Sequence, residues 1–104
     1  MATPQVLQVQ VKSFKQALDT VLDHILRDLG VETVSIESDT DFYWDVGSKS
    51  LYDMSNQSPE LDVGRLTDDW EFFSKIVDDR EQGVALMLIH AAPLLRYMGE
   101  KIGR

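Results

Sequence analysis

The chain has 104 residues, of which 10 are basic and 18 are acidic, so its formal charge is −8, and it contains no cysteine. A chain of this length is expected to form one domain and to bury roughly 60–70% of its unfolded surface. The lack of cysteine excludes a disulfide scaffold, a cysteine-based zinc site and a cysteine nucleophile, and it fits a reducing compartment. The negative charge disfavours nucleic acid and anionic membrane surfaces as partners.

The first expected element is an amphipathic helix over about residues 4–29. Its apolar residues recur with the i, i+3, i+4, i+7 spacing of one helix face. Gly30 stands at the position where a glycine commonly ends a helix. Thr3 and Pro4 resemble an N-cap followed by proline at the first helical position, although apolar residues also alternate here as in a strand. We expect one long helix. For residues 4–12 the sequence leaves two assignments open, helix or strand.

Three short strands are expected next, because the apolar period changes from that of a helix to two. They cover residues 34–36, 42–46 and 51–54, which are rich in aromatic and β-branched side chains. Residues 47–48 are expected to form the reversal between the last two strands. A further extended piece at residues 61–64 leads into the next helix.

Two helices are expected to complete the chain. Thr67 or Asp68 can cap the first of them. The second spans about residues 81–102 and is apolar nearly all round, so we expect it to be buried, with a kink at Pro93. Its most apolar stretch is shorter than the roughly 20 residues that cross a bilayer.

This order of elements predicts an α+β fold in a single domain covering residues 1–104. The expected architecture is an N-terminal helix, a three-stranded antiparallel meander and two C-terminal helices packed on one sheet face. The N-terminal residues lack the basic start of a secretion signal, so a cytoplasmic location is expected.

The acidic residues are concentrated in the middle of the chain. Residues 32–71 contain eleven acidic and two basic residues, a net charge of −9, whereas the remainder carries +1. Five of the nine aromatic residues lie in the same stretch, and two more, Phe72 and Phe73, follow it directly. Phe42 and Trp44 alternate with Tyr43, so we expect the first two on the core face and Tyr43 on the outer face. Two interpretations stay open: a solvated face with its rings inside, or a recognition surface with rings exposed among carboxylates.

The second interpretation predicts a non-enzymatic interaction module that binds a basic protein partner. Exposed rings among carboxylates favour fast, salt-sensitive association with a cationic surface. An inhibitor, an immunity-like protein or a small adaptor would use such a surface. The candidate partner-binding residues are Tyr43, Asp45, Tyr52, Asp68, Asp69 and Trp70.

An alternative function is a metal-assisted hydrolase built on an aspartate cluster. Magnesium or calcium could be held by scattered carboxylates, here Asp45, Asp62, Asp68 and Asp69. Adjacent acids at the start of a helix, however, more often act as helix caps. No metal site, cofactor or catalytic residue is therefore assigned. A third possibility is a homodimeric assembly domain that uses the last helix or an open sheet edge.

Two residues of the last helix need partners if they are buried. His90 is expected to be a core histidine rather than a catalytic base, and it could pair with a carboxylate. Arg96 is expected to pair with Asp68, Asp69 or Glu100, because a buried guanidinium needs a counter-charge.

Three segments carry recognisable motifs. Residues 43–45, 64–70 and 95–100 read Y-W-D, G-x-L-x-D-D-W and L-R-x-[IM]-G-E, in that order. Together they resemble a family of small uncharacterised bacterial proteins, over roughly residues 33–100. The resemblance implies a bacterial, mostly cytosolic α+β domain, and it implies no chemistry.

Overall fold

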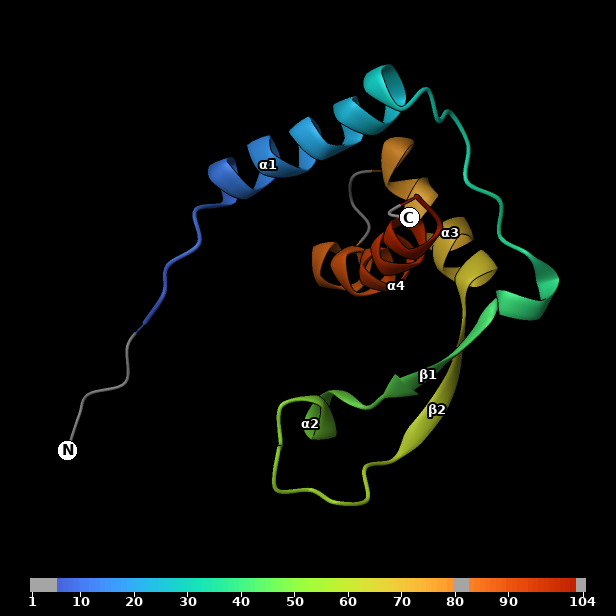
Figure 1. Cartoon of the computed structure of the whole chain (residues 1–104). Coiled ribbons are helices and arrows are strands. Elements are labelled where there is room, and N and C mark those ends of the chain that lie inside the picture. The colour runs from blue at the N-terminus through green and yellow to red at the C-terminus, as the bar shows by residue number, and fades with distance from the viewer. Residues whose placement is uncertain (1–5, 80–82, 103–104) are drawn as a thin grey trace. The chain divides into compact units, whose positions relative to one another are not determined.

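The structure, a computed structural model, describes residues 6–79 and 83–102 (Figure 1). The chain divides into two units, Met1–Val34 and Ser35–Arg104.

The first unit contains one helix. Helix α1 spans Val11–Asp23 and continues as a π-helical turn over His24–Asp28. Gly30 follows with a φ of 68°, a conformation that glycine adopts without a steric cost, and it ends the helical segment as expected.

Helix α1 begins later than the sequence predicts. Residues 6–10 have no regular structure, and residues 4 and 5 lie outside the described residues. Two of the residues at 6–10 are β-branched valines, which are weak helix formers, and no side chain caps the helix at Gln10. The expected helical start is therefore wrong for residues 6–10.

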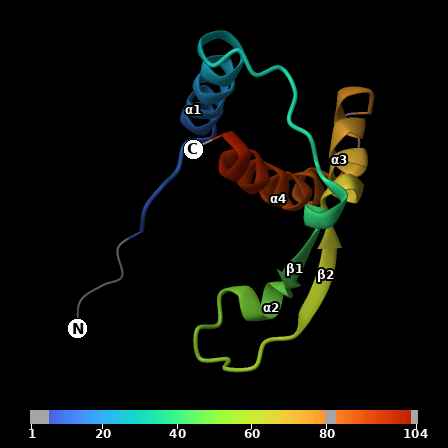
Figure 2. The same cartoon turned by 45° about the vertical axis from the view of Figure 1, so that its right-hand side comes forward.

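The second unit contains a two-stranded antiparallel sheet, here called the ribbon. Strand β1 spans Phe42–Val46 and strand β2 spans Leu61–Arg65. In the register of the sheet, Phe42 lies opposite Arg65 and Val46 lies opposite Leu61. The α+β class is thus confirmed, and the expected extended piece at 61–64 is a strand of the sheet (Figure 2).

The other two expected strands are absent from the described residues. At 34–36 the chain is irregular, and the Ser35 carbonyl accepts a hydrogen bond from the Tyr97 hydroxyl (3.2 Å). The segment between β1 and β2 is not a tight reversal, because it holds the one-turn helix α2 (Ser48–Leu51) and a polar loop. In that loop the Asp53 carboxylate accepts a hydrogen bond from the Ser55 backbone N–H (3.1 Å). Such local side-chain bonds replace the ladder bonds of a strand.

Two packed helices complete this unit. Helix α3 spans Leu66–Ser74 and continues as a 3₁₀ turn over Lys75–Val77, and helix α4 spans Val84–Ile102. The two helices pack against each other. The buried apolar residues among those described are Leu66, Met87, Ala91 and Tyr97.

Helix α4 is not buried all round, contrary to the expectation. The first turns of α4 are largely exposed to solvent. Their exposed apolar side chains are Val84, Leu86, Leu88 and Ile89. Within this unit, α3 and the segment that bonds to Tyr97 cover one stripe of α4. No helix in the described ranges has the length and apolar character that crossing a membrane requires.

The ribbon extends away from the helix pair, as Figures 1 and 2 show. Its Phe42–Arg65 end adjoins the helices, because the Leu66 N–H donates to the Asp41 carbonyl (2.8 Å) and Arg65 leads directly into α3. The helices therefore meet the ribbon at one end and do not cover a full sheet face.

Candidate partner-binding site

A buried carboxylate fixes the junction between the ribbon and α3. The Asp41 side chain accepts from the Thr67 backbone N–H (2.8 Å), from the Thr67 hydroxyl (2.8 Å) and from Arg65 Nε (2.9 Å). Burial opposes ionisation of this carboxyl, but the bonds from Thr67 and Arg65 outweigh it and lower the pKa of Asp41. Asp41 thus caps α3 from outside the helix, in place of the local caps expected at Thr67 or Asp68.

A second buried carboxylate joins the ribbon to both helices. Asp69, on α3, accepts from the Tyr43 hydroxyl of β1 (2.7 Å), and its other oxygen lies 2.6 Å from His90 Nδ1 of α4. The Phe72 and His90 rings are in contact, with centroids 4.5 Å apart. We call Tyr43, Asp69 and His90 the Asp69 triad. Burial, together with the neighbouring Asp69 carboxylate, raises the pKa of Tyr43 well above its ordinary value.

The Asp69 triad has the pattern of a carboxylate that orients a histidine. By bonding to Nδ1, Asp69 holds the ring so that Nε2 is directed elsewhere. Among the described residues, however, Tyr43 contributes the only side-chain hydroxyl that bonds to this carboxylate. The hydrogen bonds of Asp69 to Tyr43 and His90 hold β1 against α3 and α4.

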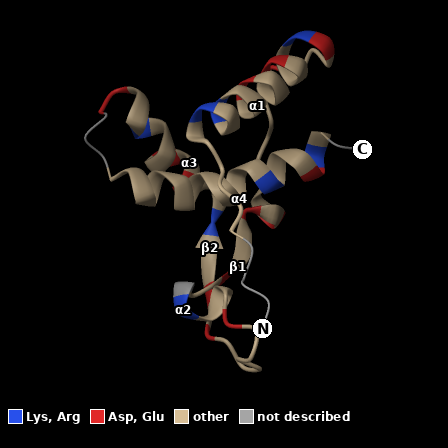
Figure 3. Ribbon diagram, turned by 90° about the vertical axis from the view of Figure 1, so that its left-hand side faces the viewer, with Lys and Arg blue, Asp and Glu red and all other residues tan. Residues whose placement is uncertain are grey.

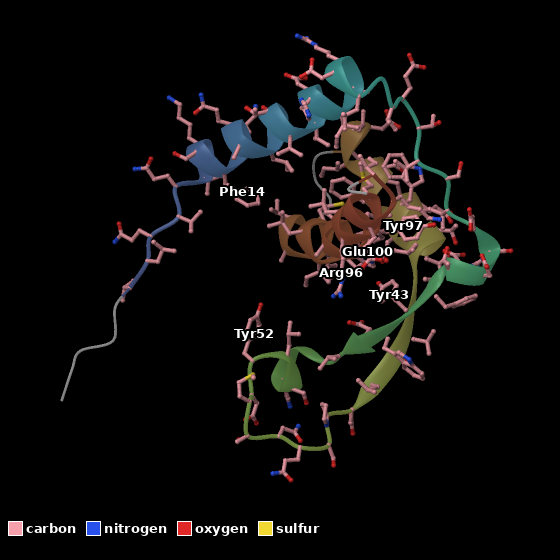
Figure 4. All side chains as sticks on the ribbon, in the orientation of Figure 1. Phe14, Tyr43, Tyr52, Arg96, Tyr97 and Glu100 are labelled. Atoms are coloured by element: carbon pink, nitrogen blue, oxygen red, sulfur yellow. The ribbon has the colours of Figure 1, made fainter. Side chains whose placement is uncertain are left out.

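Tyr43 faces the helices, contrary to the expectation that it lies on an outer face (Figure 4). Its ring lies over Gly64, its cross-strand partner, so closely that a Cβ at Gly64 would overlap the ring. A larger residue at this position would displace the Tyr43 ring from its place beside Asp69.

The opposite face of the ribbon is apolar and exposed. Phe42 is 62% exposed and Trp44 is 72% exposed, although both were expected in the core. Their cross-strand partners are Arg65 and Val63, and the Arg65 guanidinium lies 5.6 Å from the centre of the Phe42 ring. The described residues of this unit form one two-stranded layer, and they supply no second sheet layer over these rings. We call this surface the apolar face; it consists of Phe42, Trp44, Val46, Leu61, Val63 and Arg65.

Two carboxylates lie directly opposite each other on the Tyr43 side of the ribbon. Asp45 of β1 pairs with Asp62 of β2, and both are exposed. Like charges directly opposite in an antiparallel pair are destabilising. Figure 3 shows acidic residues on the ribbon and on the segment that joins its strands. A cation placed between Asp45 and Asp62 would relieve their repulsion.

The six candidate residues from the sequence fall into separate places. Tyr43 and Asp69 are hydrogen-bonded to each other, and Asp69 is buried, so its carboxylate is directed inward. Tyr52 is 86% exposed beyond the end of β1, next to α2, and Trp70 is 56% exposed on α3. Asp68 is exposed, 3.8 Å from an Arg65 nitrogen. Asp45 lies on the ribbon.

The sequence does not single out Phe42, Trp44 and Asp62 as exposed residues of the ribbon, where the two rings lie on one face and Asp62 lies on the other. A signal was present, because strict alternation places Phe42 and Trp44 together on one face. Which of the two faces is covered could not be read from alternation alone.

The aspartates considered for a metal site do not converge. Within residues 6–79 and 83–102, no group of three carboxylate or imidazole side chains is placed to hold a metal ion. Asp69 is instead bonded to Tyr43 and His90. Arg96 is exposed rather than buried, and it pairs with Glu100 (3.4 Å), one of its three expected partners (Figure 4).

Comparison with known proteins adds no relative: no family model, curated protein or solved structure matches this chain.

Proposed function

We propose that this chain is a non-enzymatic interaction module whose ribbon binds a basic protein partner. The observation that carries the proposal is the exposure of Phe42 and Trp44 on a ribbon that two buried carboxylates, Asp41 and Asp69, hold in place. Large aromatic side chains on a rigid support are the typical anchors of protein interfaces. An inhibitor, an immunity-like protein or an adaptor acting in the cytoplasm would use such a surface.

The charge of the ribbon favours a cationic partner. Asp45 and Asp62 repel each other, and Glu60 and Asp53 add two further acids in the same segment. Of the two bases in residues 42–65, Arg65 is already paired with Asp41. A basic side chain between Asp45 and Asp62 would gain attraction from both and remove their repulsion.

The geometry favours an extended partner segment. In the two-stranded sheet each strand has an outer edge that no other described strand pairs with. An added strand would continue the alternation of the ribbon, with every second side chain on the apolar face and the others on the Asp45–Asp62 side. The complementary sequence alternates apolar and basic residues.

Two fluorescently labelled peptides of about ten residues test this function. One alternates valine and lysine, and the other alternates valine and glutamate. Binding to the full chain is followed by fluorescence anisotropy from about 50 to about 500 mM salt. We expect the lysine peptide to bind and to weaken as salt rises, and the glutamate peptide not to bind.

Matched variants locate the binding surface. The pair Asp45→Asn and Asp62→Asn, or Trp44→Ala alone, is expected to weaken binding of the lysine peptide by roughly tenfold or more. The control pair Asp39→Asn and Glu71→Gln removes the same charge from exposed positions outside the ribbon, and it should change binding by less than about twofold. Equal losses in the two pairs would show general charge attraction and contradict the proposal, as would binding that is indifferent to salt.

A further inference from the structure

Helix α1 carries an apolar face that the described residues of its own unit leave largely uncovered. Val11, Phe14, Leu18, Val21 and Ile25 follow an alternating spacing of three and four residues, which places them on one side of the helix. Each of them is exposed or half-buried, and no residue of α1 is buried. A helix of this length is marginal in water by itself and is normally stabilised by packing of its apolar face.

The charges of α1 oppose its own macrodipole. Its first turn contains Lys12 and no acidic residue, and its last turn contains Asp23 and no basic residue. The dipole of a helix favours the reverse, with acids at the N-terminus and bases at the C-terminus. The following π-helical turn adds Arg27 and Asp28, which cancel in charge.

The same arrangement suits an antiparallel neighbour with the same sequence. Residues 11–17 carry a net charge of +2 and residues 18–28 carry −2. In an antiparallel pair, the basic half of each helix lies beside the acidic half of the other, and the dipoles also oppose each other favourably. A parallel pair would instead place like charges together. A pattern that is complementary to its own reversed copy matches the two-fold symmetry of a dimer.

We infer that α1 packs antiparallel against α1 of a second copy of this chain, through the face formed by Val11, Phe14, Leu18, Val21 and Ile25. The inference does not depend on the ribbon or on a basic partner. The partner that packs on this face of α1 is a second copy of the chain, because the charge pattern of α1 is complementary to its own reversed copy.

Sedimentation equilibrium of the full chain, from about 1 to about 500 µM, tests the inference. We expect a monomer–dimer equilibrium. The double variant Phe14→Glu and Val21→Glu should raise the dissociation constant by roughly tenfold or more, because it places charges in the interface. The control Gln16→Glu and Thr20→Glu adds the same charge to the polar face and should change the constant by less than about threefold.

Three results would overturn the inference: a monomer over the whole concentration range, a dimer that the Phe14 and Val21 double variant leaves intact, or equal disruption by the control. A monomer would indicate that α1 covers another part of its own chain.

Disulfide trapping in the otherwise wild-type chain tests whether the two α1 helices are antiparallel. It needs no charged substitution on the apolar face, so α1 itself is not destabilised. The chain has no cysteine, so single cysteines can be introduced at chosen positions. When the Gln10→Cys and His24→Cys variants are mixed and oxidised, an antiparallel pair yields mainly the mixed dimer, which mass spectrometry identifies. Mainly like-with-like dimers would show a parallel pair, and absence of cross-linking would show no pairing; both contradict the inference.

Discussion

Two aspartates determine how the ribbon is attached to the rest of its unit. Asp41 ties β2 and the start of α3 together, and Asp69 ties β1 to α3 and α4. Both side chains are buried, and both have hydrogen-bond partners that offset the cost of burying a charge. Asp41 and Asp69 therefore stabilise the fold, in contrast to the exposed acidic residues of the ribbon.

The Tyr43 hydroxyl should contribute measurably to stability. Tyr43→Phe removes its hydrogen bond to the Asp69 carboxylate and keeps the ring over Gly64. Because a bond to a charged group is lost from a half-buried position, we expect the free energy of unfolding to fall by about 1–2 kcal/mol in urea denaturation. Tyr52→Phe, at an 86% exposed tyrosine, is the matched control and should change it little. Equal effects of the two variants would contradict this role for the triad.

Asp41 should make the protein sensitive to acid. Its folded-state pKa lies below the ordinary value of 3.8, so its ionised form stabilises the fold at higher pH, and that contribution is lost as pH falls through the lowered pKa. We expect the urea midpoint to fall between about pH 5 and pH 2, with a shallower fall in Asp41→Asn. Asp39→Asn, at an exposed neighbour, should keep the wild-type slope. An unchanged slope in Asp41→Asn would contradict the assignment.

These residue-scale contacts could not be predicted from the sequence. Asp69 pairs with residues 26 and 21 positions away along the chain, and Asp41 pairs with residues 24 and 26 positions away. No local spacing signals such bonds. The sequence alone therefore predicts that Asp69 is a surface residue and that α3 is capped by Thr67 or Asp68.

At the scale of elements, periodicity predicted the amphipathic face of α1, the strand β1 and the approximate range of α4. It failed where polar residues satisfied the backbone locally, as at Asp53 and Ser55 in the segment between β1 and β2. The apolar composition of α4 was a poor guide to burial, because only one stripe of the helix has neighbours within its unit. Alternation placed Phe42 and Trp44 on one face but did not tell which face meets solvent.

The contact between α3 and α4 should supply most of the stability of the helix pair. Leu66, at the start of α3, is buried, so Leu66→Ala should lower the free energy of unfolding by about 2–4 kcal/mol, from lost transfer energy and a cavity. Leu88→Ala removes the same atoms from an exposed position on α4, and we expect it to cost less than about 1 kcal/mol. Similar losses in chemical denaturation of the two variants would contradict this location of the core.

At the scale of the molecule, the net charge and the exposed rings give the same expectation. From a charge of −8 we expect weak attraction to nucleic acid and preference for basic partners, with an association that weakens as salt screens the charges. The acidic middle segment and its aromatic residues predict such a partner from the sequence. The structure provides Phe42, Trp44 and the facing pair Asp45 and Asp62 as the residues on which that proposal now rests.

The most direct test of this account is a map of the surface on which the valine–lysine peptide binds. Backbone amide shifts of the ¹⁵N-labelled full chain are recorded by NMR during titration with this peptide at low salt. The account predicts shifts concentrated in β1 and β2, at Phe42–Val46 and Leu61–Arg65, that disappear at high salt. Shifts confined to the helices, or spread evenly over all acidic residues, would contradict it.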